Sequence, residues 1–519
     1  MAANSSALAS GKPGLITGRS AGGRRTLLAL ILLASGDVLL HTIFNNQYGF
    51  HRDELLSLDN ARHLAWGYVV YPPVTAVLAR VELILFGTSL RGFRFLAAVA
   101  QGLIVLLTGL SARELGGKRE AQLLGAVAIG ISGYSLFSGS FLSYSSFDYL
   151  WWVVAAYFVI RLLRSNDPRW WIGIGASAGV GLMTKYTMGF FILGIAGGIV
   201  LTPARRWLKS GWLWLGVAVA LAIVTPNLLW QAQHHFITLD FLKSIHARDI
   251  RWGWTDHFLT GQLTGNINVV TAPLFFAGLW HVFADSEGKR YRLLGWMYLI
   301  PLAAFLLAKG RDYYLAPAYP MLLAAGSVWA ENRLNSLSES AAHSIRTTIW
   351  TTFAIAGMCA AAVTIPMAPV NSRWWRFANH ANGNFHYEIG WPEMVERVAK
   401  IRDRLPAEDQ LHLGILAGDD GQAGAINLYG PAYHLPRAIS GMNSNWMRGY
   451  GDPAPETLIV VGMDSSFVKG NFASCVLAGR ISNRYGIDNK AIDGYADVFV
   501  CRHLLEPWPV FWQHFQYFG

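Results

Sequence analysis

Charged residues are scarce in this chain. Asp, Glu, Lys and Arg make up 14% of its 519 residues, against 53% hydrophobic residues. A soluble domain usually carries about 25% charged residues, so the composition excludes an ordinary water-soluble protein and predicts an integral membrane protein. Cysteine is scarce as well, because Cys359, Cys475 and Cys501 are the whole set. Three cysteines exclude a zinc site with four cysteine ligands.

The sequence also lacks a nucleic-acid-binding motif, although its formal net charge is +10. No basic cluster is combined with such a motif, and an excess of Lys and Arg is typical of cytoplasmic loops and of contact with anionic lipids. The 21 Trp and 20 Tyr residues suit the two interfaces of a bilayer. We therefore expect membrane lipids, and no nucleic acid, among the partners.

Long apolar segments recur along the first two thirds of the chain. Each is about 17 to 25 residues long, and a helix of that length crosses about 30 Å of hydrocarbon. They predict about eleven transmembrane helices, near residues 27–44, 92–112, 121–143, 147–163, 170–184, 186–202, 211–230, 258–283, 292–308, 313–330 and 348–367.

Basic residues predict how these helices are oriented. With eleven spans, the basic N-terminal tail and the loops rich in Arg and Lys all fall on one side, which predicts a cytoplasmic N-terminus. Residues 1–26 are then a disordered cytoplasmic tail, and residues 27–367 form a transmembrane domain with an external loop at 45–91. Residues 371–519 lie outside the cytoplasm. The expected location is the inner cell membrane, crossed many times.

The character of the sequence changes after residue 370. Short apolar runs such as LHLGIL, ETLIVVG and ADVFVC predict buried strands, and MVERVAKIRDRL predicts a helix. The fold class is therefore an all-α polytopic membrane protein with a small C-terminal extracytoplasmic α/β domain. In an oxidising compartment, Cys475 and Cys501 would form a disulfide; two buried free thiols are the alternative.

The external loop carries two adjacent carboxylates, Asp53 and Glu54, just after the first apolar segment. Ionisable residues at a membrane boundary are functional candidates, whereas the alternative is a solvated helix cap. The expected topology brings seven charged residues to the external boundary: Asp53, Glu54, Asp148, Lys185, Lys309, Arg311 and Asp312. Each alone could be an interfacial anchor with a snorkelling side chain; together they favour a site.

Short motifs along residues 40–335 resemble a known family. They are the DE pair of the external loop followed by Pro72 and Pro73, then SFDY, LMTKY and KGRDYYLAPAYPMLLAAG. In this order they resemble the polyprenyl-phosphate-dependent glycosyltransferases of the protein O-mannosyltransferase superfamily (glycosyltransferase family 39, GT-C fold). The aminoarabinose transferase of lipid A is a related branch. The segment AGAINLYGPAYHLPRAISGMNSNW is similar to the C-terminal domain of bacterial members.

The resemblance implies a hexosyl- or pentosyltransferase, with residues 27–367 as its catalytic domain. The donor would be a sugar on a polyprenyl phosphate, and the acceptor a hydroxyl group on a lipid, glycan or protein at the external face. The implied base is Asp53, and Asp148 is the second acidic position. We expect Glu54 or Asp148 to position the acceptor, so all three are candidate catalytic residues. Lys185, Lys309 and Arg311 would bind the donor phosphate, and Tyr71, Tyr313 and Tyr314 would contact substrate.

The expected chemistry is a single displacement. Phosphate is a good leaving group, so the reaction needs cations around the phosphate and a base for the incoming hydroxyl. One displacement inverts the anomeric centre and needs no covalent intermediate of the kind that retaining glycosidases form. We therefore expect inversion.

Two points stay open at this stage. In the aminoarabinose branch a Glu-Lys dipeptide tied to metal binding precedes the proline pair, but Val70 and Tyr71 stand here, so no cofactor is assigned and a divalent metal stays open.

A transporter or flippase is the main rival function. Charges at one face instead of the bilayer midplane, and no evident inverted repeat, argue against it. A third alternative is a non-catalytic scaffold.

Overall fold

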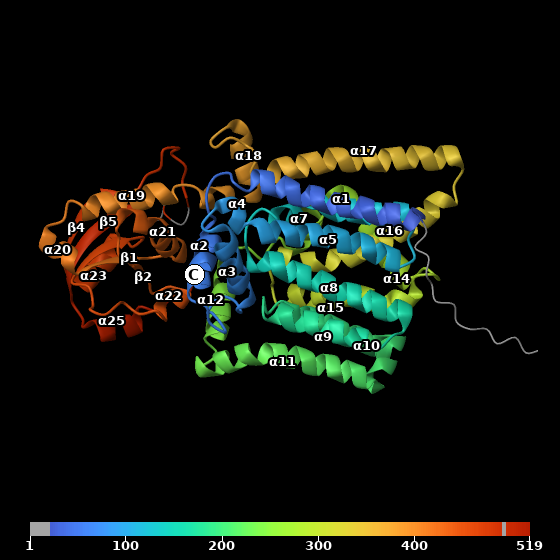
Figure 1. Ribbon diagram of the computed structural model, residues 1–519, viewed down its shortest axis with the longest axis horizontal. Helices are drawn as coiled ribbons and strands as arrows, with labels where there is room; N and C mark the ends of the chain where they lie inside the picture. The colour runs from blue at the N-terminus through green and yellow to red at the C-terminus, as the bar shows by residue number, and fades with distance from the viewer. Residues whose placement is uncertain (1–20, 490–491, 493–494) are drawn as a thin grey trace, which may run out of the picture.

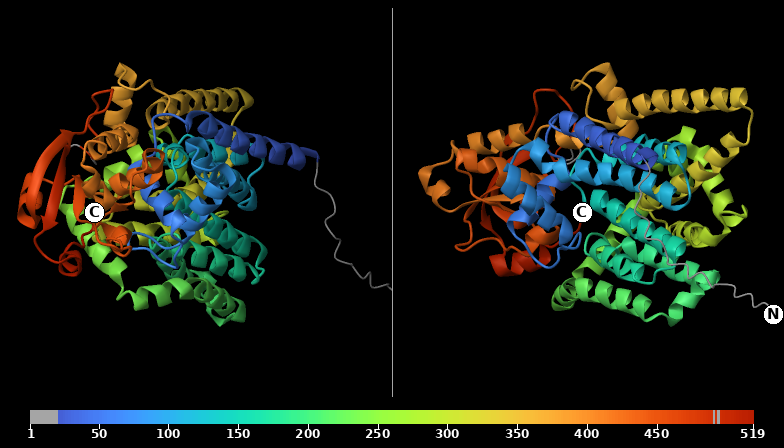
Figure 2. Two further views of the ribbon diagram at one scale, coloured as in Figure 1. Left: turned by 60° about the vertical axis from the view of Figure 1, so that its left-hand side comes forward. Right: turned by 45° about the vertical axis from the view of Figure 1, so that its right-hand side comes forward.

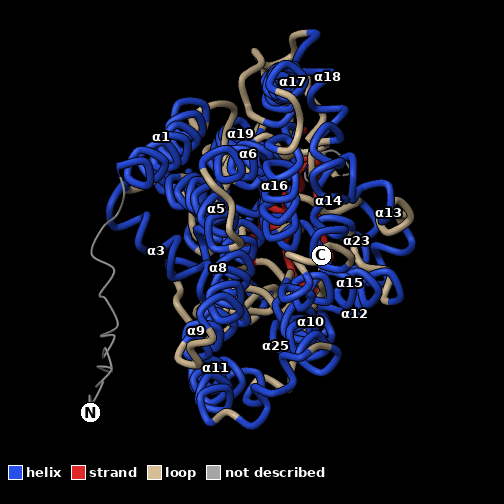
Figure 3. Tube along the Cα trace, turned by 90° about the vertical axis from the view of Figure 1, so that its right-hand side faces the viewer, coloured by secondary structure: helices blue, strands red, loops and turns tan. Residues whose placement is uncertain are grey.

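A bundle of long helices and a small sheet domain at one end of it make up the molecule (Figure 1). The computed structural model describes residues 21–489, 492 and 495–519; the predicted tail at 1–26 lies largely outside this range. The bundle helices run roughly parallel to one another in Figure 1, and Figure 3 views them from the end of the bundle that is remote from the sheet.

Among the residues that the structure describes, five helices are by themselves long and apolar enough to cross a membrane. They are α1 (Ala21–Phe44), α5 (Phe95–Glu114), α8 (Tyr144–Ser165), α11 (Gly211–Gln233) and α17 (Glu339–Thr364). The total rises to seven if each of two bent pairs counts as one span. One pair is α10 (Met188–Leu201) with η1 (Pro203–Lys209), bent by 104°; the other joins Phe258–Asn266 to Val269–Phe283 at 92°.

Helices occur in all eleven predicted segments, so the predicted membrane-helical class is confirmed, while the count of eleven stays a prediction. The remaining segments contain α6 (Arg119–Gly130), α9 (Trp170–Leu182), α15 (Arg292–Leu307) and α16 (Tyr319–Asn335). The segment predicted at 121–143 is two helices, α6 and α7 (Gly133–Ser138). A side chain at Gly133 would come within 2.8 Å of the Gly265 carbonyl oxygen, so this break lets two chain segments approach closely.

Residues 45–91, the predicted external loop, fold into three helices: α2 (Arg52–Arg62), α3 (Val74–Phe86) and α4 (Leu90–Phe93). His51 caps α2, where its ring accepts a hydrogen bond from the Asp53 amide while Glu54 accepts one from the His51 amide. This is a capping-box arrangement, which pairs amides that a helix start leaves free. The cap is present, but its two capping side chains, His51 and Glu54, are buried and not solvated.

The C-terminal residues form the predicted α/β domain around a five-stranded sheet. The strands are β1 (Leu413–Ala417), β2 (Ala438–Ile439), β3 (Thr457–Val461), β4 (Phe472–Arg480) and β5 (Asp497–Leu504), in the order β2-β1-β3-β5-β4. The first three are parallel, with Ile415 opposite Ile459, whereas β5 and β4 pair antiparallel. Helices α19 (Trp391–Arg402) and α21 (Asp420–Tyr429) pack against the sheet.

This domain is docked on the external loop, whereas the sequence suggested a separate unit. Helix α21 packs along α2, and a Cβ on Gly424 would lie 2.7 Å from the Leu55 carbonyl oxygen. Arg448 forms an ion pair with Asp59 of α2. The views in Figure 2 show the same contact between the two parts. The domain is therefore held where it can contribute to a site at the end of the bundle.

A disulfide joins Cys475 to Cys501, as predicted. The two residues face each other on the neighbouring strands β4 and β5, and Cys359 is free and exposed.

The first prediction concerns this bridge. Thiol labelling of the denatured but unreduced protein should modify Cys359 alone, and labelling after reduction should modify all three cysteines. In the chain-entropy treatment, closing a loop of this size stabilises the fold by about 3 kcal/mol, so reduction should lower the unfolding midpoint of the C-terminal domain. Three labels without reduction would contradict the bridge.

Candidate active site

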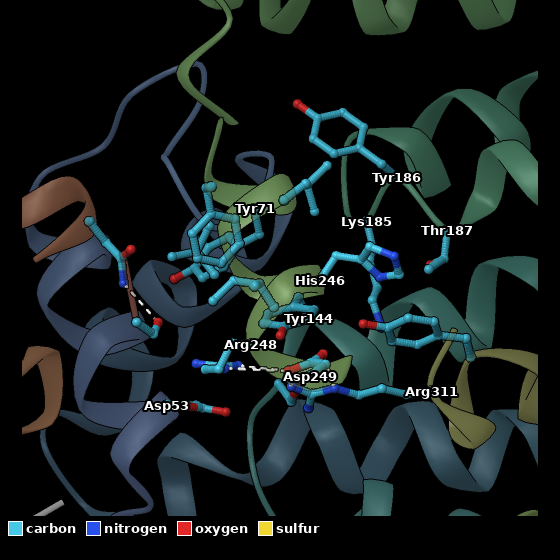
Figure 4. A pocket seen from close by; sticks show the side chains of 18 of the residues that line it. Asp53, Tyr71, Tyr144, Lys185, Tyr186, Thr187, His246, Arg248, Asp249 and Arg311 are labelled. Carbon is cyan, nitrogen blue, oxygen red and sulfur yellow. Dashed lines mark hydrogen bonds and ion pairs between the residues drawn. The ribbon is translucent and has the colours of Figure 1, made fainter. Parts of the chain in front are cut away.

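A cavity of about 340 Å³ lies where the bundle, the external loop and the C-terminal domain meet. Its walls come from α2, the Val70–Pro72 segment, the turn between α9 and α10, helix α12 (Ile237–Arg251) and residues 308–314. Seven of the nine predicted site residues line it: Asp53, Tyr71, Lys185, Lys309, Arg311, Tyr313 and Tyr314. Figure 4 shows Asp53 and Lys185 approaching it from different elements. The fold therefore brings together residues up to 261 positions apart, from Asp53 to Tyr314.

Asp53 stands in the first turn of α2, with its side chain 37% exposed. The Arg52 Nε lies 3.5 Å and the His51 Nδ1 4.0 Å from its carboxylate oxygens. Burial works against the charged form, but His51, Arg52 and the more distant Arg311 outweigh it, so the pKa of the Asp53 carboxyl lies below its ordinary value. Asp53 is therefore an ionised acceptor at neutral pH, facing the cavity.

Glu54 does not line the cavity. Its carboxylate is buried and takes two hydrogen bonds from Arg94, at 2.9 Å from Nε and 2.7 Å from Nη2. The amides of His51 and Leu142 donate to it as well. Successive residues of a helix point about 100° apart, so Asp53 and Glu54 face different surroundings. The predicted role of Glu54 in positioning the acceptor has no geometric basis.

Glu54 instead belongs to a buried cluster around Arg94. The Arg94 Nη2 also lies 3.1 Å from Glu388, which comes from the η6 turn (Phe385–Glu388) ahead of the C-terminal sheet domain. Burial raises the pKa of Glu388 to about 8, although Arg94 opposes the shift. One guanidinium thus joins the external loop, the start of α5 and the segment leading to the C-terminal domain.

Asp148 is likewise absent from the cavity wall. It is buried in the first turns of α8, where Thr187 Oγ1 donates to it at 2.7 Å and Trp152 Nε1 at 3.1 Å. Thr187 lines the cavity. Asp148 is therefore linked to the cavity wall through Thr187, without lining the cavity itself.

Lys185 is held among aromatic rings. Its Nζ lies 5.2, 4.9 and 4.5 Å from the ring centroids of Tyr144, Tyr313 and Tyr314 and donates to Ser145 Oγ at 3.0 Å. Such rings stabilise an ammonium without neutralising it. Lys309 is exposed, at a left-handed position with φ of 48°. Both therefore keep positive charge available at the cavity.

Arg311 is paired. Its Nε and Nη2 each lie 2.7 Å from an oxygen of Asp249, and Trp254 stacks against the guanidinium. Asp249 is also 3.3 Å from Arg248. Two guanidinium groups thus share one carboxylate, which leaves this wall of the cavity net positive (Figure 4). Sequence reasoning missed Asp249, because its partner Arg311 is 62 residues away, and it missed the neighbouring Arg248 with it.

The C-terminal domain supplies residues that were also missed: Asp419, Asp420, Met442 and Asn443. They follow β1 and β2, at the carboxyl ends of parallel strands, where open α/β sheets bind ligands. Asp419 lies 3.7 Å from Arg52. The signal in the sequence was an acidic pair after the strand LGILA.

A metal site is not evident among the residues that the structure describes. Within them, no group of three or more His, Cys, Asp or Glu side chains is arranged to hold an ion. Val70 and Tyr71, which stand where the Glu-Lys dipeptide would be, line the cavity without offering a usual metal ligand. The residues do not fit a bound metal, and the chemistry below uses none.

Comparisons with known proteins show what the chain is similar to. Residues 70–230 match the family described as dolichyl-phosphate-mannose-protein mannosyltransferase. The lipid A galacturonosyltransferase RgtD of Rhizobium johnstonii is 28% identical over 256 residues, which are 46% of this chain and 52% of that protein. An undecaprenyl phosphate-alpha-4-amino-4-deoxy-L-arabinose arabinosyl transferase of Pseudomonas fluorescens is 26% identical over 47% of each chain. This chain thus spans about half the length of the curated relatives that it matches.

The crystal structure of ArnT from Cupriavidus metallidurans bound to undecaprenyl phosphate has the same fold. It superposes with a TM-score of 0.58 over 91% of this chain and 98% of that one, at 14% identity. The resemblance inferred from the short motifs is confirmed: residues 70–230 match the mannosyltransferase family, and the fold is similar to that of ArnT.

Proposed function

We propose that the protein is a membrane glycosyltransferase that moves a sugar from a polyprenyl-phosphate donor to an acceptor hydroxyl at the external membrane face. The observation that carries this proposal is the cavity at the end of the bundle. It combines an ionised carboxylate, Asp53, with a wall of cations and tyrosines. Glycosyl transfer needs cations for the donor phosphate and a carboxylate for the acceptor hydroxyl within one cavity.

The cations bind and stabilise the departing phosphate. Lys185 and Lys309 bring positive charge to the cavity, and Arg248 and Arg311 add a net positive charge after sharing Asp249. A fixed positive environment favours the charge that develops on a leaving phosphate more than it favours the neutral parts of the donor. Tyr313 and Tyr314 hold Lys185 in place and offer aromatic surface beside it.

Asp53 accepts the proton of the acceptor hydroxyl as that oxygen attacks the anomeric carbon. The carbon–oxygen bond to phosphate breaks in the same step, so the product has inverted configuration. No covalent sugar intermediate is needed for such a single displacement. Asp148 positions Thr187 and the Lys185 turn, and Glu54 holds α2 through Arg94.

A lipid acceptor in the bacterial inner membrane is the preferred assignment. The relatives are named for lipid A and for undecaprenyl phosphate, and the cavity opens where the apolar bundle ends. The N-terminus is then cytoplasmic and the disulfide-bearing domain external. A transporter or flippase is less favoured, because the charged cavity lies at one end of the bundle and is closed over by a docked domain.

The donor-phosphate role is tested by Lys185→Met. Charge-assisted contacts to phosphate contribute about 1.5–3 kcal/mol, so the donor Michaelis constant should rise ten-fold or more. Lys243→Met is the matched control, because Lys243 is on the exposed face of α12 with 78% of its side chain accessible. The assay measures release of undecaprenyl phosphate against donor concentration. The same donor Michaelis constant in Lys185→Met and Lys243→Met would contradict a role of Lys185 in binding the donor phosphate.

A further inference from the structure

The C-terminal domain presents the carboxyl ends of its parallel strands to the cavity. The chain leaves β1 at Ala417 and places Asp419 and Asp420 on the wall; it leaves β2 at Ile439 and places Asn443 there. Strand order changes direction around β1, since β2 lies on one side and β3 on the other. Ligands of open α/β sheets bind at such points.

The C-terminal domain offers mainly hydrogen-bond acceptors at this end of the cavity. Asp420 is buried, with its carboxylate 2.5 Å from Asn443 Nδ2 and 2.7 Å from Asn445 Nδ2. Because the amide nitrogen of Asn443 points to Asp420, its Oδ1 faces elsewhere. That oxygen belongs to a fully buried side chain on the cavity wall and has no partner among the described residues. A buried acceptor without a donor is costly, and a bound donor group would satisfy it.

The positive charge at this end of the cavity comes from Arg52, which is already paired with carboxylates. Arg52 lies 3.5 Å from Asp53 and 3.7 Å from Asp419, so one guanidinium faces two carboxylates and a third, Asp420, lies beyond. Burial and the neighbouring Asp419 raise the pKa of Asp420 to about 7. An anionic substituent placed here would meet these carboxylates and not the cations of the opposite wall.

We propose that Asp419, Asp420 and Asn443 form a subsite for the transferred sugar, which accepts hydrogen bonds from its hydroxyl or amino groups and rejects a carboxylate. The inference rests on the proposed glycosyl transfer and names the class of sugar: neutral or amino-bearing, not a uronic acid. A cavity of about 340 Å³ is near the lower end for ligand sites, which span about 300–1,000 Å³. It suits one sugar ring beside a phosphate.

The test separates the sugar from its carrier. Binding of undecaprenyl phosphate and of undecaprenyl-phosphate mannose is measured for the full-length protein and for Asp419→Asn and Asp420→Asn. Asparagine keeps the α21 cap that Asp419 provides. In both variants the affinity for the mannose donor should fall ten-fold or more, with the affinity for undecaprenyl phosphate unchanged. Asp464→Asn, in the same domain and outside the cavity, is the control and should change neither.

A second comparison tests the rejection of acidic sugars. The wild-type protein should bind undecaprenyl-phosphate galacturonate at least ten-fold more weakly than the mannose donor at pH 8, and the two aspartate variants should narrow this difference. Unchanged mannose-donor affinity in both variants, equal loss of carrier binding, or equal wild-type affinity for the two donors would overturn the subsite. A wild-type protein that binds no undecaprenyl phosphate would instead overturn the proposed function itself.

Discussion

Asp53→Asn should lower turnover by about 10²–10⁴-fold, the range that a positioned general base contributes. Asparagine is nearly isosteric but cannot take the proton of the acceptor hydroxyl. Because Asp53 faces the cavity and its side chain is 37% exposed, the substitution should leave the unfolding midpoint and the affinity for undecaprenyl phosphate nearly unchanged. Single-turnover release of the carrier phosphate measures the effect on the chemical step.

The controls for Asp53 are Asp53→Glu and Asp240→Asn. The added methylene of glutamate moves the carboxylate by about 1 Å, which misplaces it against the reacting carbon, so little activity should return. Asp240 is an exposed carboxylate on α12 with 60% of its side chain accessible, and its replacement should be silent. Near wild-type turnover in Asp53→Asn would contradict the assignment of Asp53 as the general base.

Arg94→Met should destabilise the protein by about 3–5 kcal/mol, the usual cost of removing one partner from a buried ion pair. The side chains of Arg94 and Glu54 are fully buried, and that of Glu388 is 7% exposed. Without the guanidinium, two carboxylates would lie close together in a buried setting with no cation. Methionine fills most of the vacated volume, so the loss of charge dominates over the loss of packing.

Chemical unfolding of the solubilised protein measures this effect. Arg91→Met is the matched control, because Arg91 lies three residues earlier on the short helix α4 and is exposed. Glu54→Gln should also lower stability, whereas Asp53→Asn should not, which separates the structural carboxylate from the one at the cavity. An Arg94→Met protein with an unchanged midpoint would contradict the role assigned to this cluster.

The fold class could be predicted from the sequence, because composition and the length of apolar runs are local properties of the chain. Apolar runs mark helices, and the strands LHLGIL, ETLIVVG and ADVFVC coincide with β1, β3 and β5. Strand β4 was missed, although its centre is a short apolar run, because that run has only four residues and none of them is buried in the structure. The break between α6 and α7 was missed as well, because it depends on the close approach of Gly265 to Gly133.

The site was predicted only in part, because some of its contacts join residues that are far apart in the sequence. Asp53, Lys185, Lys309 and Arg311 were found because the topology placed them at one boundary. Which of Asp53 and Glu54 faces the cavity is decided by Arg94, 40 residues later, and this pairing leaves no local pattern. The same holds for Asp249, whose partner is Arg311, and for Asp420, whose place depends on how the C-terminal domain docks.

The central claim is that the cavity performs sugar transfer, and one reconstitution tests it directly. The protein is placed in proteoliposomes with a radiolabelled undecaprenyl-phosphate sugar and lipid A, and both the free carrier and the labelled lipid are measured. The account predicts one undecaprenyl phosphate released for each sugar transferred, with both signals lost in Asp53→Asn. Donor that crosses the bilayer intact, with no carrier released and no effect of Asp53→Asn, would contradict it and favour a flippase.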